Sequence, residues 1–254
     1  MTKKRRNWTR NELIVAFNLY CKIAFSKINY RHPLVVQLAE AIDRTPSAVA
    51  WKLVNFASLD PSLTKRGIKG ATNTSKLDKI IFEEFTNNWE DLVYESEILL
   101  SQFLGTDIAV TTQGDLEFKQ GLEVEKQVKV RVNQSFFRNI VLSSYDFKCC
   151  LTGIDIPELL IASHIVPWSK DKKNRLNPQN GLCLNNLHDK AFDKGLITFD
   201  TSFKAVLSSQ LKNNDNHTII QYFQNLEGKS LMLPKRFIPD EKFLEYHHKN
   251  VFQI

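Results

Sequence analysis

The sequence predicts an α+β protein whose N-terminal part is all-α and whose C-terminal part mixes short strands with helices. Apolar residues recur at helical spacing through roughly the first hundred residues, whereas short apolar runs bounded by turn formers follow later. The two parts also differ in charge. Residues 1–70 hold thirteen Lys and Arg against four Asp and Glu, a net charge of +9. The whole 254-residue chain has a net charge of +6, so the remainder sums to −3.

Composition excludes several classes of protein. Hydrophobic residues at 43% and charged residues at 24% are typical of globular chains, and seventeen Phe argue against extensive disorder. No apolar run approaches the ~18 residues of a membrane span, and the basic N-terminus leads into no apolar signal segment. Four cysteines, two of them adjacent, make a poor disulfide framework. We therefore expect a reduced, cytoplasmic protein that does not cross a membrane.

Three helices are predicted near the N-terminus, each with a start signal. Thr9 and Glu12 have the spacing of a capping box, in which each side chain accepts from the other residue's backbone amide. Pro33 begins the second helix. Thr45 caps the third, and Pro46 occupies its first position, where a missing N–H has no cost.

The second and third of these helices have the layout of a helix-turn-helix motif. In such a motif the N-terminal turn of the second helix can enter the major groove of DNA. Arg44, Ser47 and Lys52 are then the candidates for DNA contact. The alternative is a small bundle whose third helix only packs; the +9 charge favours DNA, because a basic module suits a polyanion.

The rest of the N-terminal part leads to a domain boundary. Residues 58–75 are rich in turn formers and basic residues and predict a loop, and residues 76–103 predict helix. We interpret 1–104 as a basic recognition module, 105–130 as a linker, and 131–254 as a second domain.

The second domain is predicted to contain a helix, two strands, a second helix and a hairpin. The expected elements are a helix from Asn133 to about Tyr145, strands at Leu159–Val166 and Leu182–Leu184, a helix at Asn186–Lys194, hairpin strands at Leu196–Phe199 and Ala205–Ser208, and a helical tail from Pro239. Gly195 is a suitable residue to stop the second helix.

Three motifs in the second domain carry chemical information. They are ASHIVPW at 162–168, NPQNGLC at 177–183 and LHDKAFDKG at 187–195. Their order and spacing resemble the HNH endonucleases, over roughly residues 130–210. The resemblance implies a ββα-metal core, in which a β-hairpin and one helix surround a metal ion. It further implies metal-dependent hydrolysis of DNA phosphodiester bonds and a role in restriction or defence.

The resemblance also implies roles for individual residues. It assigns His164 as the general base, Asn180 to pinning the hairpin, and His188 to metal binding. This is chemically reasonable, since a histidine titrates near neutral pH and can take a proton from water. A divalent cation, Mg²⁺ or Mn²⁺, can neutralise charge on the phosphate and the leaving oxygen.

One position departs from the pattern of many such nucleases. Ser163 stands immediately before the base, where a metal-binding Asp or His is common. A hydroxyl is a poor ligand for a hard cation compared with a carboxylate. The metal is therefore expected to recruit Asp189 or Asp193, or to bind with fewer protein ligands and more water. Asp193 could equally make a local cap.

The remaining Cys and His residues have no clear motif. No Cys-x-x-Cys pair exists, so a structural zinc is not expected, and Cys150 and Cys183 are expected to pack as small apolar residues. His32, His217, His247 and His248 are expected to be surface or packing residues.

Basic residues around the motifs are candidates for phosphate contact, which positions a duplex without reading its sequence. They are Arg138, Lys170, Lys172, Lys173 and Arg175. For residues 170–175, a merely solvated loop is an equal alternative.

The expected function is thus an endonuclease acting on double-stranded DNA. A homodimer is plausible, because cutting both strands usually needs two active sites. The main alternative is a DNA-binding regulator with a degenerate, non-cleaving core. A third is an RNA-directed or toxin-like nuclease, which a helix-turn-helix disfavours because the major groove of A-form RNA is too narrow for a helix.

Overall fold

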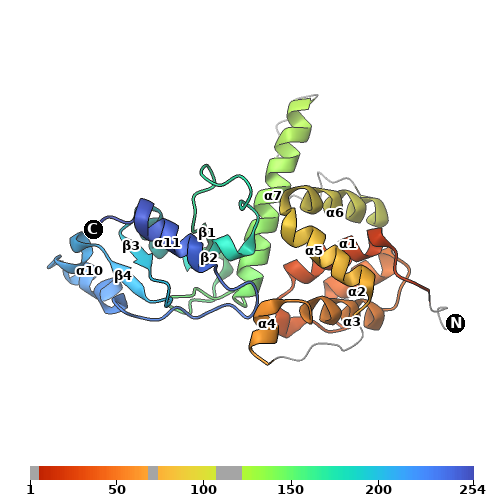
Figure 1. Cartoon of the computed structure of the whole chain (residues 1–254), viewed down its shortest axis with the longest axis horizontal. Helices are drawn as coiled ribbons and strands as arrows, with labels where there is room; N and C mark the ends of the chain where they lie inside the picture. The colour runs from red at the N-terminus through yellow and green to blue at the C-terminus, as the bar shows by residue number, and fades with distance from the viewer. Residues whose placement is uncertain (1–5, 68–73, 107–121) are drawn as a thin grey trace. The chain divides into compact units, whose positions relative to one another are not determined.

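The computed structural model describes residues 6–67, 74–106 and 122–254. The chain divides into two compact units, Met1–Ser143 and Ser144–Ile254. The described residues form eleven α-helices and two antiparallel two-stranded sheets, and both sheets belong to the second unit (Figure 1). None of the described helices is both long enough and apolar enough to cross a membrane.

The first unit is entirely helical in its described residues. Its helices are α1 (Arg10–Lys22), α2 (Pro33–Ala41), α3 (Pro46–Ala57), α4 (Pro61–Lys65), α5 (Lys76–Asn87), α6 (Trp89–Leu104) and α7 (Leu122–Ser144), with a 3-10 turn, η1, at Phe25–Lys27. Both bonds of the predicted capping box are present, because the Thr9 amide donates to Glu12 Oε2 over 2.9 Å and the Glu12 amide donates to Thr9 Oγ1 over 3.3 Å. The predicted Thr45 cap of α3 is also confirmed.

Helix α1 is the centre of this unit. Every residue from Glu12 to Cys21 is buried, so the helix is covered on all sides by its neighbours. The Phe17 ring lies 4.5 Å from that of Phe85 and 5.0 Å, edge-on, from that of Phe56. These aromatic contacts join α1 to α5 and α3, and they account for the burial of the apolar faces that the periodicity predicts.

Three details of the first unit differ from expectation. The helical stretch 76–103 is two helices, because Asn88 leaves helical geometry at φ −146° and ψ 67°. The expected loop 58–75 contains the short helix α4. Helix α7 begins at Leu122 rather than Asn133, so residues 122–130 of the expected linker are helical. Residues 107–121 of that linker lie outside the described part of the chain.

Helix α7 starts early because its apolar spacing continues upstream of Asn133. The buried side chains Val128, Val132 and Phe136 recur every four residues and lie on one face of the helix. Helix-favouring residues such as Lys, Gln and Arg fill the positions between them.

The second unit is built around a β-hairpin and a helix. Strands β1 (Leu160–His164) and β2 (Gly181–Asn185) pair antiparallel, with His164 opposite Gly181, and β2 leads directly into α8 (Asn186–Asp193). The other elements are β3 (Ile197–Phe199), β4 (Ala205–Leu207), α9 (Ser209–Lys212), α10 (His217–Tyr222), α11 (Glu241–Asn250) and the 3-10 turns η3 (Pro157–Leu159), η4 (Pro178–Asn180) and η5 (Gln224–Leu226). The predicted strands, helix and second hairpin are all present.

The C-terminal segment packs against the end of α8. Gly195 has φ +68°, and a Cβ at this position would lie 2.0 Å from the Val251 carbonyl oxygen. The Gln253 amide donates to the Gly195 carbonyl over 2.8 Å. The His247 ring stacks on Phe192 at 3.7 Å, so the expected packing role of His247 is confirmed.

Candidate active site

The hairpin and α8 place the three motifs together. His164 is the last residue of β1, and Asn180 immediately precedes β2. Helix α8, which carries His188, packs against both strands. The loop between the strands begins and ends at the same edge of the hairpin, because the antiparallel pairing brings His164 opposite Gly181.

The His164 ring is held by the loop between the strands. Its Nε2 lies 2.9 Å from the Arg175 carbonyl oxygen, and its ring meets Trp168 edge-on with 5.4 Å between centroids. A carbonyl oxygen only accepts, so Nε2 carries the hydrogen and Nδ1 carries the lone pair. Burial lowers the pKa of His164, which favours the neutral imidazole that a general base requires.

Asn180 ties the two ends of this loop together. Its Oδ1 accepts from the Val166 amide over 2.7 Å, and its Nδ2 donates to the Val166 and Asn174 carbonyls, each over 3.2 Å. Its own carbonyl accepts from the Ile165 amide over 3.0 Å. The side chain is fully buried, so these bonds determine the backbone path directly after His164.

His188 is buried, and both of its ring nitrogens face other groups. Nδ1 lies 2.9 Å from Asn185 Nδ2, and Nε2 lies 3.3 Å from the Tyr222 carbonyl oxygen. The Asn185 amide donates to Nδ1, so Nε2 carries the hydrogen. In this arrangement the lone pair of His188 faces the Asn185 amide, and metal binding by His188 stays a prediction.

Ser163, which precedes His164 in β1, faces Asp189 of α8, and Asp193 lies one turn further along that helix. Ser163 Oγ is buried and completes no hydrogen bond of ordinary geometry among the described residues, yet it lies close enough to Asp189 to lower the pKa of that carboxyl. Burial, with the nearby charge of Asp193, outweighs this contact, so the pKa of Asp189 is raised. A cation would relieve the repulsion between the two carboxylates.

This donor set suits a hard divalent cation. Carboxylate oxygens are the ligand type that Mg²⁺ and Mn²⁺ prefer, a hydroxyl is a weaker ligand, and Mg²⁺ commonly uses only one or two carboxylates together with water. Within residues 6–67, 74–106 and 122–254, no group of three or more His, Cys, Asp or Glu side chains is arranged to hold a metal.

Comparison with known proteins identifies this region. Residues 149–200 match the family model described as HNH endonuclease. The chain contains an HNH domain. The match spans the hairpin, α8 and β3, and it confirms the resemblance seen in the sequence motifs. No curated protein matches the chain.

Two residues of the HNH domain that contact His188, Asn185 and Cys149, were not predicted from the sequence. Asn185 caps α8, because its Oδ1 accepts from the His188 amide over 3.0 Å, and the same side chain orients the His188 ring. An Asn directly before a predicted helix is a capping signal that could have found it. Burial raises the pKa of the Cys149 thiol, but bonds to His188 and Thr152 outweigh burial, and the pKa falls to about 7.

The other two cysteines near the hairpin behave as expected. Cys150 and Cys183 are free, buried thiols, so their predicted apolar packing is confirmed. Burial raises the pKa of Cys150 well above its ordinary value, so this thiol stays protonated.

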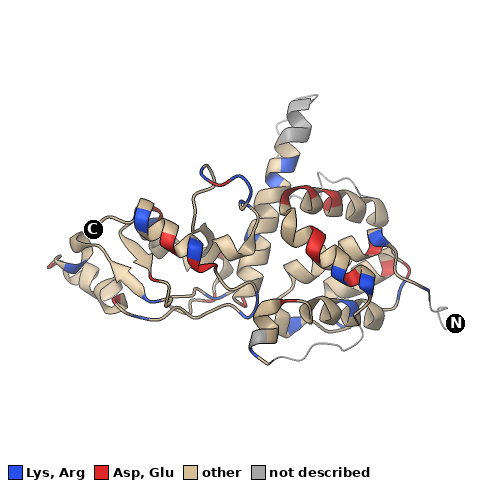
Figure 2. Cartoon of the chain, viewed as in Figure 1, with Lys and Arg blue, Asp and Glu red and all other residues tan. Residues whose placement is uncertain are grey.

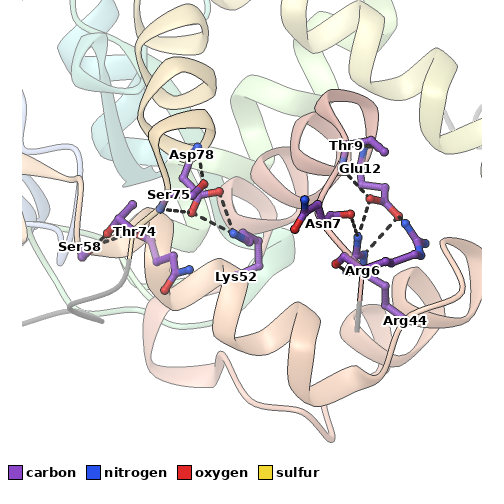
Figure 3. A network of polar contacts seen from close by, with 11 residues as sticks. Arg6, Asn7, Thr9, Glu12, Arg44, Lys52, Ser58, Thr74, Ser75 and Asp78 are labelled. Atoms are coloured by element: carbon purple, nitrogen blue, oxygen red, sulfur yellow. Dashed lines mark hydrogen bonds and ion pairs between the residues drawn. The ribbon is translucent and has the colours of Figure 1, made fainter. Parts of the chain in front are cut away.

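Two of the residues predicted to contact DNA have acidic partners inside the first unit. Arg44 is buried, pairs with Glu12 at 2.8 Å and lies 4.0 Å from the Trp8 ring centroid. Lys52 is buried and contacts both carboxylate oxygens of Asp78, at 2.8 and 2.9 Å (Figure 3). Both charges are neutralised inside the unit. Ser47, by contrast, is exposed on α3.

Other basic side chains of residues 1–70 pair, like Lys52, with acids beyond residue 70. Helices α5 and α6 are rich in Asp and Glu (Figure 2). Arg10 pairs with Glu84 and Glu95, at 2.8 and 2.6 Å, and Lys22 pairs with Glu97. The +9 charge of residues 1–70 therefore overstates the positive field of the folded unit.

The candidates near the HNH motifs have different surroundings. Lys170, Lys172 and Lys173 are exposed in the loop between β1 and β2, and Arg175 is half-buried there. Arg138 lies half-buried on α7 and belongs to the first unit.

Proposed function

We propose that the chain is a metal-dependent endonuclease that hydrolyses phosphodiester bonds in double-stranded DNA. The observation that carries the proposal is His164, in an HNH domain, with Nε2 bonded to the Arg175 carbonyl and its lone pair on Nδ1. In the reaction, Nδ1 accepts a proton from the water that attacks the phosphorus. Asn180 keeps the loop closed, so the base stays oriented.

Asp189 and Asp193, with the Ser163 hydroxyl, would hold the divalent cation. When bound, the cation neutralises charge on the phosphate and the leaving oxygen. His188, with Asn185, keeps the start of α8 in place, and this fixes the direction in which Asp189 faces Ser163.

DNA contact would come from both units. In the HNH domain, Lys173 and Arg175 lie in the loop that holds the base. In the first unit, α3 exposes Ser47 and leaves Trp51 65% exposed, and the residues up to about 104 would serve as a recognition module. A role in restriction or defence rests on the resemblance to restriction-type HNH nucleases.

The test is cleavage of supercoiled plasmid by the full chain with Mg²⁺ or Mn²⁺. We expect nicked or linear DNA with 5′-phosphate ends, and we expect His164→Ala to abolish cleavage while DNA binding persists. Cleavage that survives in this variant would remove His164 from the role of base. If deletion of residues 1–104 abolished DNA binding and His164→Ala did not, the result would support the recognition role of the first unit.

Ser163 supports a second candidate, a DNA-binding protein whose HNH domain no longer cuts. A hydroxyl in place of a carboxylate weakens the metal site. Binding of duplex DNA without cleavage, in either metal, would favour this alternative.

A further inference from the structure

Arg175 is fixed in place by contacts that leave its charge uncompensated. Its Nε–H donates to the Trp168 carbonyl over 2.8 Å, and its guanidinium carbon lies 5.2 Å from the centroid of the Trp168 ring. The same Trp168 ring packs edge-on against His164. The Arg175 guanidinium and the His164 imidazole therefore both contact the Trp168 ring.

Arg175 differs in its surroundings from Arg10 and Arg44. Each of those side chains is within 2.8 Å of at least one glutamate oxygen. Arg175 has no carboxylate within ion-pair distance and no hydrogen bond to Nη1 or Nη2 among the residues the structure describes. A half-buried guanidinium with both terminal amino groups uncommitted is suited to an anion, and its planar fork matches two phosphate oxygens.

The loop around Arg175 keeps its one carboxylate away from that anion. Asp171 Oδ1 accepts from the backbone amides of Lys173 and Asn174, each over 3.1 Å. Asp171 Oδ2 accepts from Asn174 Nδ2 over 2.7 Å. Both carboxylate oxygens of Asp171 therefore accept hydrogen bonds from within the loop, while the lysine side chains beside it are exposed.

We propose that Arg175 binds the phosphate under attack with its terminal amino groups while its backbone carbonyl orients His164. One residue would then align the substrate with the base. The inference rests on the proposed nuclease function and specifies how that same site holds its substrate. Trp168 is a positioning residue in this arrangement, because it acts only through Arg175 and His164.

The test compares Arg175→Ala and Arg175→Lys with the wild type in single-turnover cleavage of a duplex oligonucleotide. Removal of a charged donor that stabilises the transition state lowers the rate about 100- to 1,000-fold. Lysine keeps the charge but not the fork or the Trp168 bond, so it should restore only part of this loss. Lys204→Ala, which removes an exposed positive charge at the β3–β4 turn, serves as the control and should cut like the wild type.

Two further measurements separate substrate contact from loss of structure. Guanidinium ion added to Arg175→Ala should restore cleavage, whereas an alkylammonium ion of equal charge should not. In a His164→Ala background with EDTA, Arg175→Ala should weaken binding of the same duplex. It should also reduce the slope of log affinity against log salt concentration by about 1, the contribution of one phosphate contact. The inference would be overturned if Arg175→Ala cut at the wild-type rate. It would also be overturned if Arg175→Ala lost cleavage, guanidinium did not restore it, and the affinity for the duplex were unchanged.

These measurements also separate the inference from the proposed function. If the wild type cuts and His164→Ala does not, the nuclease function stands whatever Arg175 does. If the wild type does not cut, the binding measurement in EDTA still decides whether Arg175 contacts phosphate.

Discussion

The buried His247 predicts an acid-sensitive stability of the second unit. The ring is stacked on Phe192, its Nδ1 lies 2.9 Å from Thr198 Oγ1, and its Nε2 lies 3.1 Å from the Phe192 carbonyl. Burial lowers the pKa of His247 from 6.5 to about 4, outweighing its bond to that carbonyl. Protonation would place a charge where water cannot solvate it.

The sign and size follow from linkage between protonation and folding. The folded pKa is below the unfolded one, so the stabilisation is complete above pH 6.5 and is lost as the pH falls toward 4. At about 1.4 kcal/mol per pKa unit, the lowered pKa corresponds to roughly 3 kcal/mol at full protonation, of which about 2 kcal/mol should be lost between pH 7 and 4.5.

The measurement compares the wild type with His247→Gln. Glutamine can occupy the same space and does not titrate, so it removes the effect of His247 while other groups titrate equally in both proteins. The free energy of unfolding in urea would be measured at both pH values, with hydrogen exchange of residues 241–254 to locate the change. We expect the difference in free energy of unfolding between the two proteins to shift by about 2 kcal/mol in favour of glutamine at pH 4.5. A difference that does not change with pH would refute the assignment.

Two other predictions follow from the packing. Gly195→Ala should lower the melting temperature far more than Gly228→Ala, because both glycines have positive φ but only at position 195 would the new Cβ meet backbone, 2.0 Å from Val251 O; equal losses in thermal melts would contradict the close approach. Lys52→Ala should cost about 3–5 kcal/mol of stability by leaving Asp78 buried and unpaired, measured by urea unfolding, whereas the double variant with Asp78→Ala should recover much of that loss. If Lys52→Ala instead lowered DNA affinity strongly and left stability unchanged, Lys52 would be a DNA-contact residue.

Local signals in the sequence located most elements correctly. Thr9, Glu12 and Thr45 act within one helical turn of the residues they cap. The strands around His164 and Asn180, and the helix that follows, also depend on short apolar runs and turn formers. Both partners of such an interaction lie within a few residues of each other, so the local sequence is enough to predict it. The motifs likewise sufficed to recognise the HNH domain.

The tertiary structure decided how charged and polar side chains are used. Lys52 became an internal residue because Asp78, 26 residues further on, reaches it inside the folded unit. The His188 nitrogens are engaged by Asn185 and by the carbonyl of Tyr222, which is 34 residues away. A net charge counts side chains without their partners, and those partners are brought together only by the packing of distant elements. The sequence by itself therefore determined where His164, the loop after it and the helix with His188 lie along the chain. Only the fold decided which side chains remain available to a metal ion or to DNA.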